Sequence, residues 1–252
     1  MVVVIPIYKS ILSSDEIISL EQCFKILGQH EIRFVAPLGL DVSEYQSRLN
    51  KEMKVEFFEP NYFTNIRGYN QLMLSLEFYT RFKAYEYMLI YQLDCFVFRD
   101  ELDYWCKQGY DYIGAPWLDY SFYNKSRIEK NKFLIRRFLN KTNKYTTRDV
   151  LVNRVGNGGF SLRKIAACIN TLKEKPKNIT DKFRLSNNTN SLFNEDVFWS
   201  IEASKLKKPN YKIASKFSLD TAVEIGIRLN NNKLPFGCHA WHKNYKSWKN
   251  YI

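Results

Sequence analysis

Short apolar runs recur through the first sixty residues and predict buried strands. The run from Val2 to Ile7 is continuous, rich in β-branched side chains and too short for a helix, which is typical of a central strand covered on both faces. Similar runs at 32–36 and 55–58 stop at prolines and predict two further strands. The segments between them have helical spacing, so the chain begins as a parallel α/β unit with right-handed crossovers.

Helix-start and helix-stop signals bound these segments. Ser13 and Glu16 have the spacing of a capping box, and the helix they begin is expected to end at Gly28. A second helical stretch over 68–87 is predicted to divide into two helices near Ser75.

The later elements are predicted in the same way. Strands are expected at 87–93 and 110–117, a helix at 164–174, and another helix beginning at Asn194. No internal repeat or low-complexity linker interrupts the pattern. One α/β domain over 1–252 is therefore predicted, with a mixed, mostly parallel central sheet flanked by helices.

Composition and charge refine this picture. The chain has 252 residues, of which 45% are hydrophobic, enough for a sizeable core. The five cysteines include no C-x-x-C pair, and the apolar start lacks a basic leader, so a cytoplasmic protein without a disulfide framework is expected. The net charge of +12 is concentrated in residues 124–154, which carry +8, and in the last ten residues, which carry +3.

The charged segments suggest two attachments to a nearly neutral body. The insertion at about 121–153 contains apolar and basic residues at helical spacing over 133–139, which suits an anionic membrane surface. Lys243, Lys246 and Lys249 alternate with aromatic residues and suggest a second interfacial element. The alternative is a solvated insertion whose apolar residues pack onto the body.

Four motifs are candidates for chemistry. Asp94 follows a buried strand, where a carboxylate can hold Mg²⁺ or Mn²⁺ or simply cap a turn. The three glycines over 156–159 permit either close approach of a ligand or a tight turn before a strand. Glu195 and Asp196 fit either a helix N-terminus or a general base. His239 is either a metal ligand or an ordinary core or surface histidine.

In chain order, these motifs resemble those of a bacterial family of uncharacterised glycosyltransferase-like domains of the GT-A class. The segments that carry the resemblance are 2–8, 91–98, 114–117, 156–163, 194–199 and 235–241. It covers nearly the whole chain except residues 121–153, and its strength comes from the order of six motifs that are individually unspecific. It implies a nucleotide-binding half over 1–100 and an acceptor and catalytic half over 101–252.

The resemblance implies roles for residues on the donor side. It assigns the first strand and its loop to the nucleotide base, and the residues after the Asp94 strand to the diphosphate and its metal. Where the family has Asp-x-Asp, this chain has Asp94-Cys95-Phe96, so Asp94 and His239 are the remaining metal ligands and dependence on Mn²⁺ or Mg²⁺ is uncertain. Arg81 is expected either to reach the donor or to be an exposed helix residue. The predicted nucleotide-sugar site consists of Pro6, Ile7, Tyr8, Arg81, Gln92, Asp94, Gly158 and Gly159.

The resemblance also implies the reaction. The segment Glu195-Asp196-Val197 is similar to a motif of inverting transferases whose Asp is the base, so Asp196 is preferred to Glu195. Trp117 and Trp199 are expected to contact the acceptor. The implied activity is transfer of a sugar from a nucleotide sugar, UDP-linked by expectation, to a hydroxyl of a glycan or lipid-linked acceptor in bacterial surface-polysaccharide or lipopolysaccharide synthesis.

Two other classes stay open at this point. A pI of about 9.3 and 16% aromatic residues are compatible with a nucleic-acid-binding module, although no RRM, KH or helix-turn-helix signature is present and the charge is localised. A nucleotidyltransferase of similar α/β build would carry a Gly-rich loop with Arg and Lys after the first strand, and residues 7–10 lack one. The preferred prediction includes no nucleic-acid partner.

Overall fold

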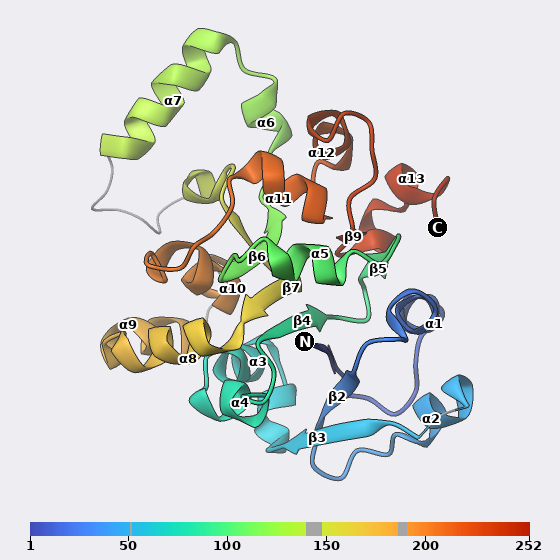
Figure 1. Ribbon diagram of the computed structural model, residues 1–252. Helices are drawn as coiled ribbons and strands as arrows, with labels where there is room; N and C mark the ends of the chain where they lie inside the picture. The colour runs from blue at the N-terminus through green and yellow to red at the C-terminus, as the bar shows by residue number, and fades with distance from the viewer. Residues whose placement is uncertain (51, 140–147, 186–190) are drawn as a thin grey trace.

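The computed structural model describes residues 1–50, 52–139, 148–185 and 191–252. Within these residues the strands form a six-stranded sheet of order β3-β2-β1-β4-β7-β6 and a three-stranded sheet of order β5-β9-β8 (Figure 1). The strands are β1 (Val2–Pro6), β2 (Ile32–Pro37), β3 (Lys54–Phe58), β4 (Tyr87–Tyr91), β5 (Phe96–Val97), β6 (Tyr112–Pro116), β7 (Val155–Lys164), β8 (Ser218–Leu219) and β9 (Gly237–Cys238).

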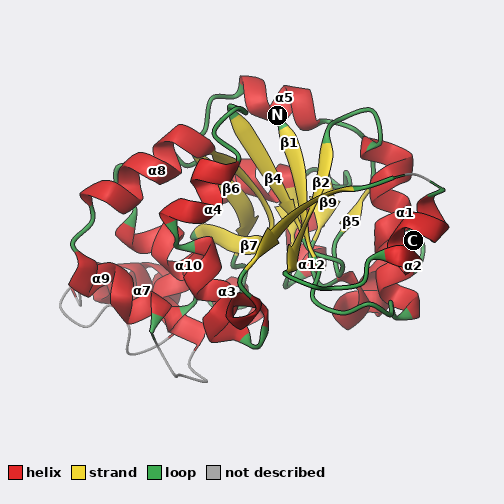
Figure 2. Ribbon diagram, turned by 90° about the horizontal axis from the view of Figure 1, so that it is seen from below, coloured by secondary structure: helices red, strands yellow, loops and turns green. Residues whose placement is uncertain are grey.

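Helices surround both sheets (Figure 2). The α-helices are α1 (Ser14–Leu27), α2 (Ser43–Leu49), α3 (Ile66–Met73), α4 (Leu76–Arg81), α5 (Leu102–Lys107), α6 (Tyr120–Tyr123), α7 (Arg127–Leu139), α8 (Ile165–Glu174), α9 (Lys177–Arg184), α10 (Glu195–Val197), α11 (Tyr211–Phe217), α12 (Val223–Leu229) and α13 (Tyr245–Trp248). Short 3-10 turns are η1 (Pro60–Phe63), η3 (Arg148–Leu151), η4 (Ser191–Phe193) and η6 (Trp241–Asn244), and a π-helical turn, η5, covers Phe198–Glu202.

The large sheet is mixed and mostly parallel, as the sequence predicts. Strands β1, β2, β3 and β4 are parallel to one another, whereas β7 is antiparallel to both β4 and β6. Along β1, Val3 and Ile5 face one hydrophobic cluster and Val2 and Val4 face another, so the strand is buried on both sides. Helices α1, α5 and α11 contribute to the first cluster, and α3, α4 and α8 contribute to the second.

Local signals located two helix boundaries correctly. Ser13 caps α1, with its hydroxyl accepting from the Glu16 backbone and the Glu16 carboxylate accepting from the Ser13 backbone, as a capping box requires. Ser75 caps α4 directly after α3, where the sequence predicts the break.

Two expectations require correction. The glycines over 156–159 lie inside β7 and form no turn before a strand, because β7 already begins at Val155 and pairs with β6 there. In the predicted second interfacial element, Trp248 is fully buried and packs on Phe98, so it cannot belong to an exposed surface; Tyr245 and Tyr251 are exposed, and the rest of that element stays a prediction.

The insertion is partly helical and extends from the body. Figure 1 shows α7 at the top left, projecting beyond the remaining elements, and the structure describes no buried residue in it. Residues 140–147, which belong to the predicted insertion, lie outside the described residues. None of the described helices combines the length and the apolarity needed to cross a bilayer.

Candidate functional site

A cleft of about 580 Å³ opens at the carboxyl ends of β1 and β4. In a parallel sheet this edge is where loops leave adjacent strands and ligands bind. The residues that line the cleft are Pro6, Ile7, Tyr8, Lys9, Ser13, Asp15, Glu16, Tyr45, Tyr62, Phe63, Asn65, Ile66, Tyr69, Gln92, Leu93, Asp94 and His242. The structure therefore brings five of the predicted donor residues together: Pro6, Ile7, Tyr8, Gln92 and Asp94.

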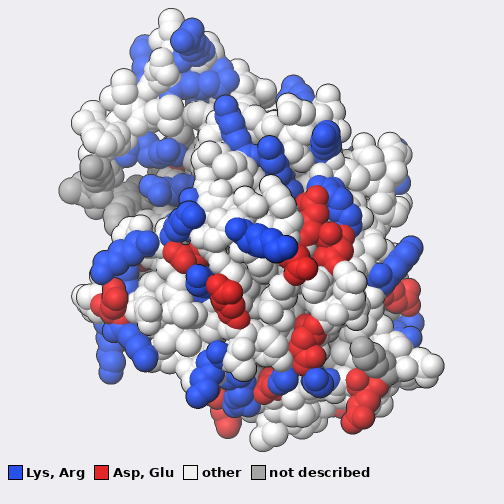
Figure 3. All heavy atoms as spheres, viewed as in Figure 1, with Lys and Arg blue, Asp and Glu red and all other residues white. Residues whose placement is uncertain are grey.

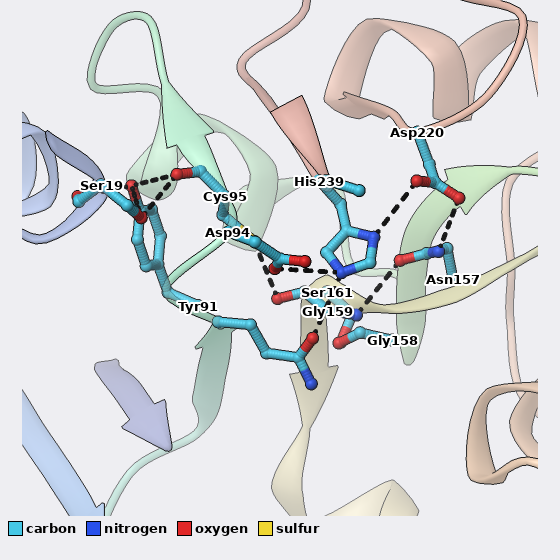
Figure 4. A network of polar contacts seen from close by, with 12 residues as sticks. Ser19, Tyr91, Asp94, Cys95, Asn157, Gly158, Gly159, Ser161, Asp220 and His239 are labelled. Carbon is cyan, nitrogen blue, oxygen red and sulfur yellow. Dashed lines mark hydrogen bonds and ion pairs between the residues drawn. The ribbon is translucent and has the colours of Figure 1, made fainter. Parts of the chain in front are cut away.

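The small sheet positions two carboxylates and one imidazole close together beside this cleft. Asp220 directly follows β8 and His239 directly follows β9, and these strands pair in register through Leu219 and Cys238. Strand β5 pairs with β9 in the antiparallel direction, which brings the preceding Asp94 to the same end. His239 consequently lies between two carboxylates, with Nε2 3.2 Å from Oδ1 of Asp94 and Nδ1 3.3 Å from Oδ1 of Asp220 (Figure 4).

Hydrogen bonds hold the turn that carries Asp94. The hydroxyls of Ser19 and Tyr91 both donate to the carbonyl of Cys95, at 2.6 and 3.1 Å. The Cys95 thiol donates to the Gly159 carbonyl, which also accepts from the Gln92 backbone. Figure 4 shows this network joining β4, the turn and β7, so Asp94 is attached to the core of the sheet.

The two carboxylates determine the protonation of His239. Burial opposes the charged imidazole, but the hydrogen bonds from the ring to Asp220 and Asp94 outweigh this and raise the pKa of His239 to about 10. Burial alone would raise the pKa of Asp94, and contact with His239 lowers it below its usual value. Nε2 also lies 3.2 Å from Oε1 of Gln92, so both ring nitrogens face acceptors, which suits an imidazolium.

Gly158 and Gly159 allow side chains to approach β7 from two directions. A Cβ on Gly158 would overlap the carboxylate of Glu195, and a Cβ on Gly159 would overlap the His239 ring and lie 2.7 Å from Oε1 of Gln92. Close approach, which the glycines permit, is thus their function here. The partners that approach are side chains of this chain.

Glu195 is half of a buried ion pair. Its Oε1 lies 3.0 Å from an Nη of Arg163, whose guanidinium also donates to the hydroxyls of Tyr79 and Ser161. Both side chains are buried, and Oε2 of Glu195 has no hydrogen-bond partner among the described residues. Glu195 thus has a buried ion-pair partner, whereas no ion pair joins neighbouring Asp196 to another of the described residues.

Asp196 has the electrostatic character of a base near neutral pH. Burial, followed by repulsion from Glu195, raises the pKa of Asp196 to about 7. The backbone N–H of Val197 donates to its Oδ1 at 2.8 Å, and His239 exerts a weaker opposing influence. Asp196 does not line the cleft but lies within electrostatic range of His239, which contacts the cleft residue Asp94.

Comparison with known proteins identifies the family. A model of the family described as "Protein of unknown function (DUF5672)" matches residues 52–239, which is most of the chain and includes Asp94, Glu195, Asp196 and His239. The chain belongs to the DUF5672 family. No curated protein sequence matches this DUF5672 chain.

Several solved structures similar to this DUF5672 protein are those of glycosyltransferases. Mouse xyloside xylosyltransferase 1 superimposes with a TM-score of 0.52 at 10% identity, covering 94% of this chain and 96% of that one. An active-site mutant of LgtC gives 0.50 at 13% identity, covering 95% and 86%. The bifunctional glycosyltransferase WbbM gives 0.51 at 10% identity, covering 94% of this chain and 45% of WbbM. At these identities the similarity shows the fold, which is that of GT-A glycosyltransferases.

Three of the residues predicted to bind donor or acceptor in this DUF5672 chain do not line the cleft. Arg81 lies outside the cleft, 3.4 Å from Glu56 and 3.7 Å from Glu77, with its guanidinium over the Phe58 ring. Trp199 is fully buried among core aromatic rings, so the prediction that it contacts an acceptor is wrong for this conformation. Trp117 packs against Gly156 and remains half-buried, and its contact with an acceptor stays a prediction.

Sequence reasoning missed Asp220 and Asn157. Asp220 bonds both His239 and the Asn157 amide, whose own Oδ1 accepts from the Gly159 backbone. The sequence signal for Asp220 was weak, because the strand before it, β8, has only two residues and contains no apolar run. Only the pairing of β8 with β9 makes Asp220 a neighbour of His239.

Proposed function

We propose that this DUF5672 protein is a glycosyltransferase that moves a sugar from a nucleotide-sugar donor to a hydroxyl of an acceptor. The observation that carries the proposal is the position of the Asp94–His239 pair beside a cleft at the carboxyl ends of β1 and β4. The GT-A fold supports it, because the similar solved structures are glycosyltransferases.

The cleft has the size and lining for a nucleotide. Its volume of about 580 Å³ lies within the usual range for small-molecule sites. The aromatic side chains of Tyr8 and Tyr62 line it and offer faces on which a base could stack, whereas Tyr45, which also lines it, is buried against Phe34. Lys9 also lines the cleft, where its ammonium is 2.7 Å from Glu16.

Asp94 and His239 could serve as two protein ligands of a divalent ion, provided that the ion displaces the proton from Nε2 of His239. Oδ1 of Asp94 is buried, and its partner among the described residues is Nε2 of His239, 3.2 Å away. Mg²⁺ and Mn²⁺ bind through one or two protein groups together with substrate phosphates. Within the described parts of the chain no group of three or more His, Cys, Asp or Glu side chains suits a metal. A bound ion would neutralise charge on the diphosphate leaving group.

Asp220 would then orient His239. Its carboxylate accepts from Nδ1–H, which leaves Nε2 directed toward Asp94 and Gln92. A carboxylate behind a ligating histidine sets the tautomer and ring orientation in this way. Asn157 holds Asp220 in place through a 3.0 Å hydrogen bond.

Asp196 is the proposed base. Its raised pKa lets it be ionised and still accept a proton near neutral pH. The acceptor hydroxyl gives its proton to Asp196 as its oxygen attacks the anomeric carbon. The bond between that carbon and the diphosphate oxygen breaks, and the nucleoside diphosphate leaves with the electron pair. A single displacement of this kind inverts the anomeric centre.

Donor binding is the first test. A panel of UDP-, GDP-, CDP- and dTDP-sugars is screened by thermal shift with and without Mn²⁺. A donor at 100 times its Kd stabilises the protein by about 2.7 kcal/mol, which raises Tm by roughly 5–11 °C for a chain of this size. The Asp94→Asn variant should lose most of this stabilisation. If no nucleotide sugar stabilises the wild type and none is consumed, the proposal fails.

The role of Asp196 is tested by turnover. Asp196→Asn should bind the donor as the wild type does but release nucleoside diphosphate at least about 100-fold more slowly, since it cannot accept the proton. The matched control is Asp103→Asn, which changes an exposed aspartate on α5. Wild-type turnover by Asp196→Asn would remove Asp196 from the mechanism.

A further inference from the structure

Helix α7 turns its apolar face away from the protein. Its contacts with the described part of the body include those of Phe133, which packs on Phe122, Lys130, which donates to the carbonyl of Tyr123 at 2.8 Å, and Arg137, which donates to the carbonyl of Val152 at 2.6 Å. Lys130, Phe133 and Arg137 are spaced by three and four residues and so share one side of the helix. The side of α7 that faces the protein is therefore mainly cationic.

The opposite side is aliphatic and exposed. Ile128, Ile135 and Leu139 are spaced by seven and four residues, which places them on one face, and they are 68%, 60% and 71% exposed. Leu134 beside them is 40% exposed. A soluble helix normally turns such a stripe toward the core. In α7 the contacts with the body occupy the other side, so the stripe faces outward.

Exposed cations accompany this stripe. Arg127, Lys132 and Arg136 are exposed, and α7 as a whole has five basic side chains against Glu129. Figure 3 shows Lys and Arg atoms interspersed with uncharged atoms over the lobe at the upper left, where Figure 1 places α7. The outward surface thus combines aliphatic side chains with positive charge.

We propose that α7 docks the protein onto an anionic lipid bilayer, with Ile128, Ile135 and Leu139 entering the headgroup boundary. Aliphatic side chains are solvated by acyl chains, and cations beside them pair with anionic headgroups. Two copies of α7 would bring like charges together, so charge complementarity favours lipid over a second copy. Most of the exposed apolar side chains of α7 are aliphatic, and Phe138 is the one ring among them on which a base could stack, so this face favours acyl chains over nucleic acid.

The strength of binding to the bilayer should depend on both the exposed cations and the aliphatic side chains of α7. Each cation near an anionic surface is worth about 1 kcal/mol, or roughly fivefold in partitioning. Loss of the three exposed cations should weaken partitioning by roughly 100-fold. Loss of two aliphatic anchors should weaken it by at least about tenfold.

Flotation with lipid vesicles tests the proposal without a sugar donor, so its result is independent of the proposed activity. The wild type should float with phosphatidylcholine vesicles containing phosphatidylglycerol, remain unbound with phosphatidylcholine alone, and dissociate as salt is raised. The α7 variants are Ile135→Ser with Leu139→Ser, and Arg127→Gln with Lys132→Gln and Arg136→Gln. Both should keep the wild-type circular dichroism and Tm, since the altered side chains are exposed.

Matched controls change the same chemistry elsewhere. Leu38→Ser with Tyr104→Ser removes exposed apolar groups outside α7, and Lys83→Gln with Lys173→Gln and Lys177→Gln removes three exposed cations. Both controls should float as the wild type does. The proposal is overturned if the wild type does not bind anionic vesicles, if controls and α7 variants lose binding equally, or if size exclusion shows that α7 instead joins two copies.

Discussion

Replacing Arg163 by Met should destabilise the protein strongly. Met is flexible and apolar, so it fills much of the space but leaves the carboxylate of Glu195 buried without its 3.0 Å partner. Oε2 of that carboxylate already lacks a hydrogen-bond partner among the described residues. The hydroxyls of Tyr79 and Ser161 also lose their donor.

The expected loss of stability follows from the burial of this ion pair. Removing one partner of a buried ion pair costs about 3–5 kcal/mol, because the remaining charge has no compensation. At about 2–4 °C per kcal/mol for a chain of this length, Tm should fall by roughly 6–20 °C. Arg81→Met is the control: Arg81 pairs with Glu56 and Glu77 at the surface, where such contacts are worth about 1 kcal/mol or less.

Urea and thermal unfolding of four proteins complete the experiment: wild type, Arg163→Met, Glu195→Gln and the double variant. If the pair is structural, the double variant should be less destabilised than the sum of the single variants, by at least about 1 kcal/mol. An Arg163→Met protein as stable as Arg81→Met would refute this reasoning. Additive effects would show that the two side chains act independently, contrary to the contact described.

Three further predictions concern the site. Gly159→Ala, whose Cβ would overlap the His239 ring, should displace that ring by about 1 Å and lower kcat roughly 100-fold in a nucleoside-diphosphate release assay, and an unchanged kcat would count against this role of Gly159. The wild-type rate should rise as pH increases through about 7, because Asp196 must lose its proton to act as base, and a rate independent of pH across this range would contradict that role. Asp220→Asn should weaken Mn²⁺ binding in calorimetry by roughly 10–100-fold, since the carboxylate that orients His239 is lost; unchanged affinity would count against orientation.

Elements with strong local signals were predictable. The capping box of Ser13 and Glu16 and the Ser75 cap act within one helical turn, so neighbouring residues suffice to locate them. The apolar run in β1 predicts burial on both faces, because each face of a central parallel strand needs covering. Four parallel strands follow from such runs separated by helices.

Residues whose role depends on a distant partner were not predictable. Trp199 and Trp248 have the same side chain as Trp117, yet only the packing of the folded chain decides that the first two are buried and the third is half exposed. Glu195 and Asp196 are adjacent acids in the sequence. Their difference arises because Arg163, on β7, reaches Glu195.

By itself, the sequence determined the α/β class, the order of the first strands and helices, the position of Asp94 after a buried strand and the concentration of positive charge in the insertion. These features depend on local periodicity and composition. The tertiary structure alone decided that Asp220 stands behind His239, that Glu195 is paired with Arg163, and that α7 directs Ile135 and Leu139 outward. Each of these results from strand pairing or helix orientation between segments far apart in the chain, and local patterns carry no information about such contacts.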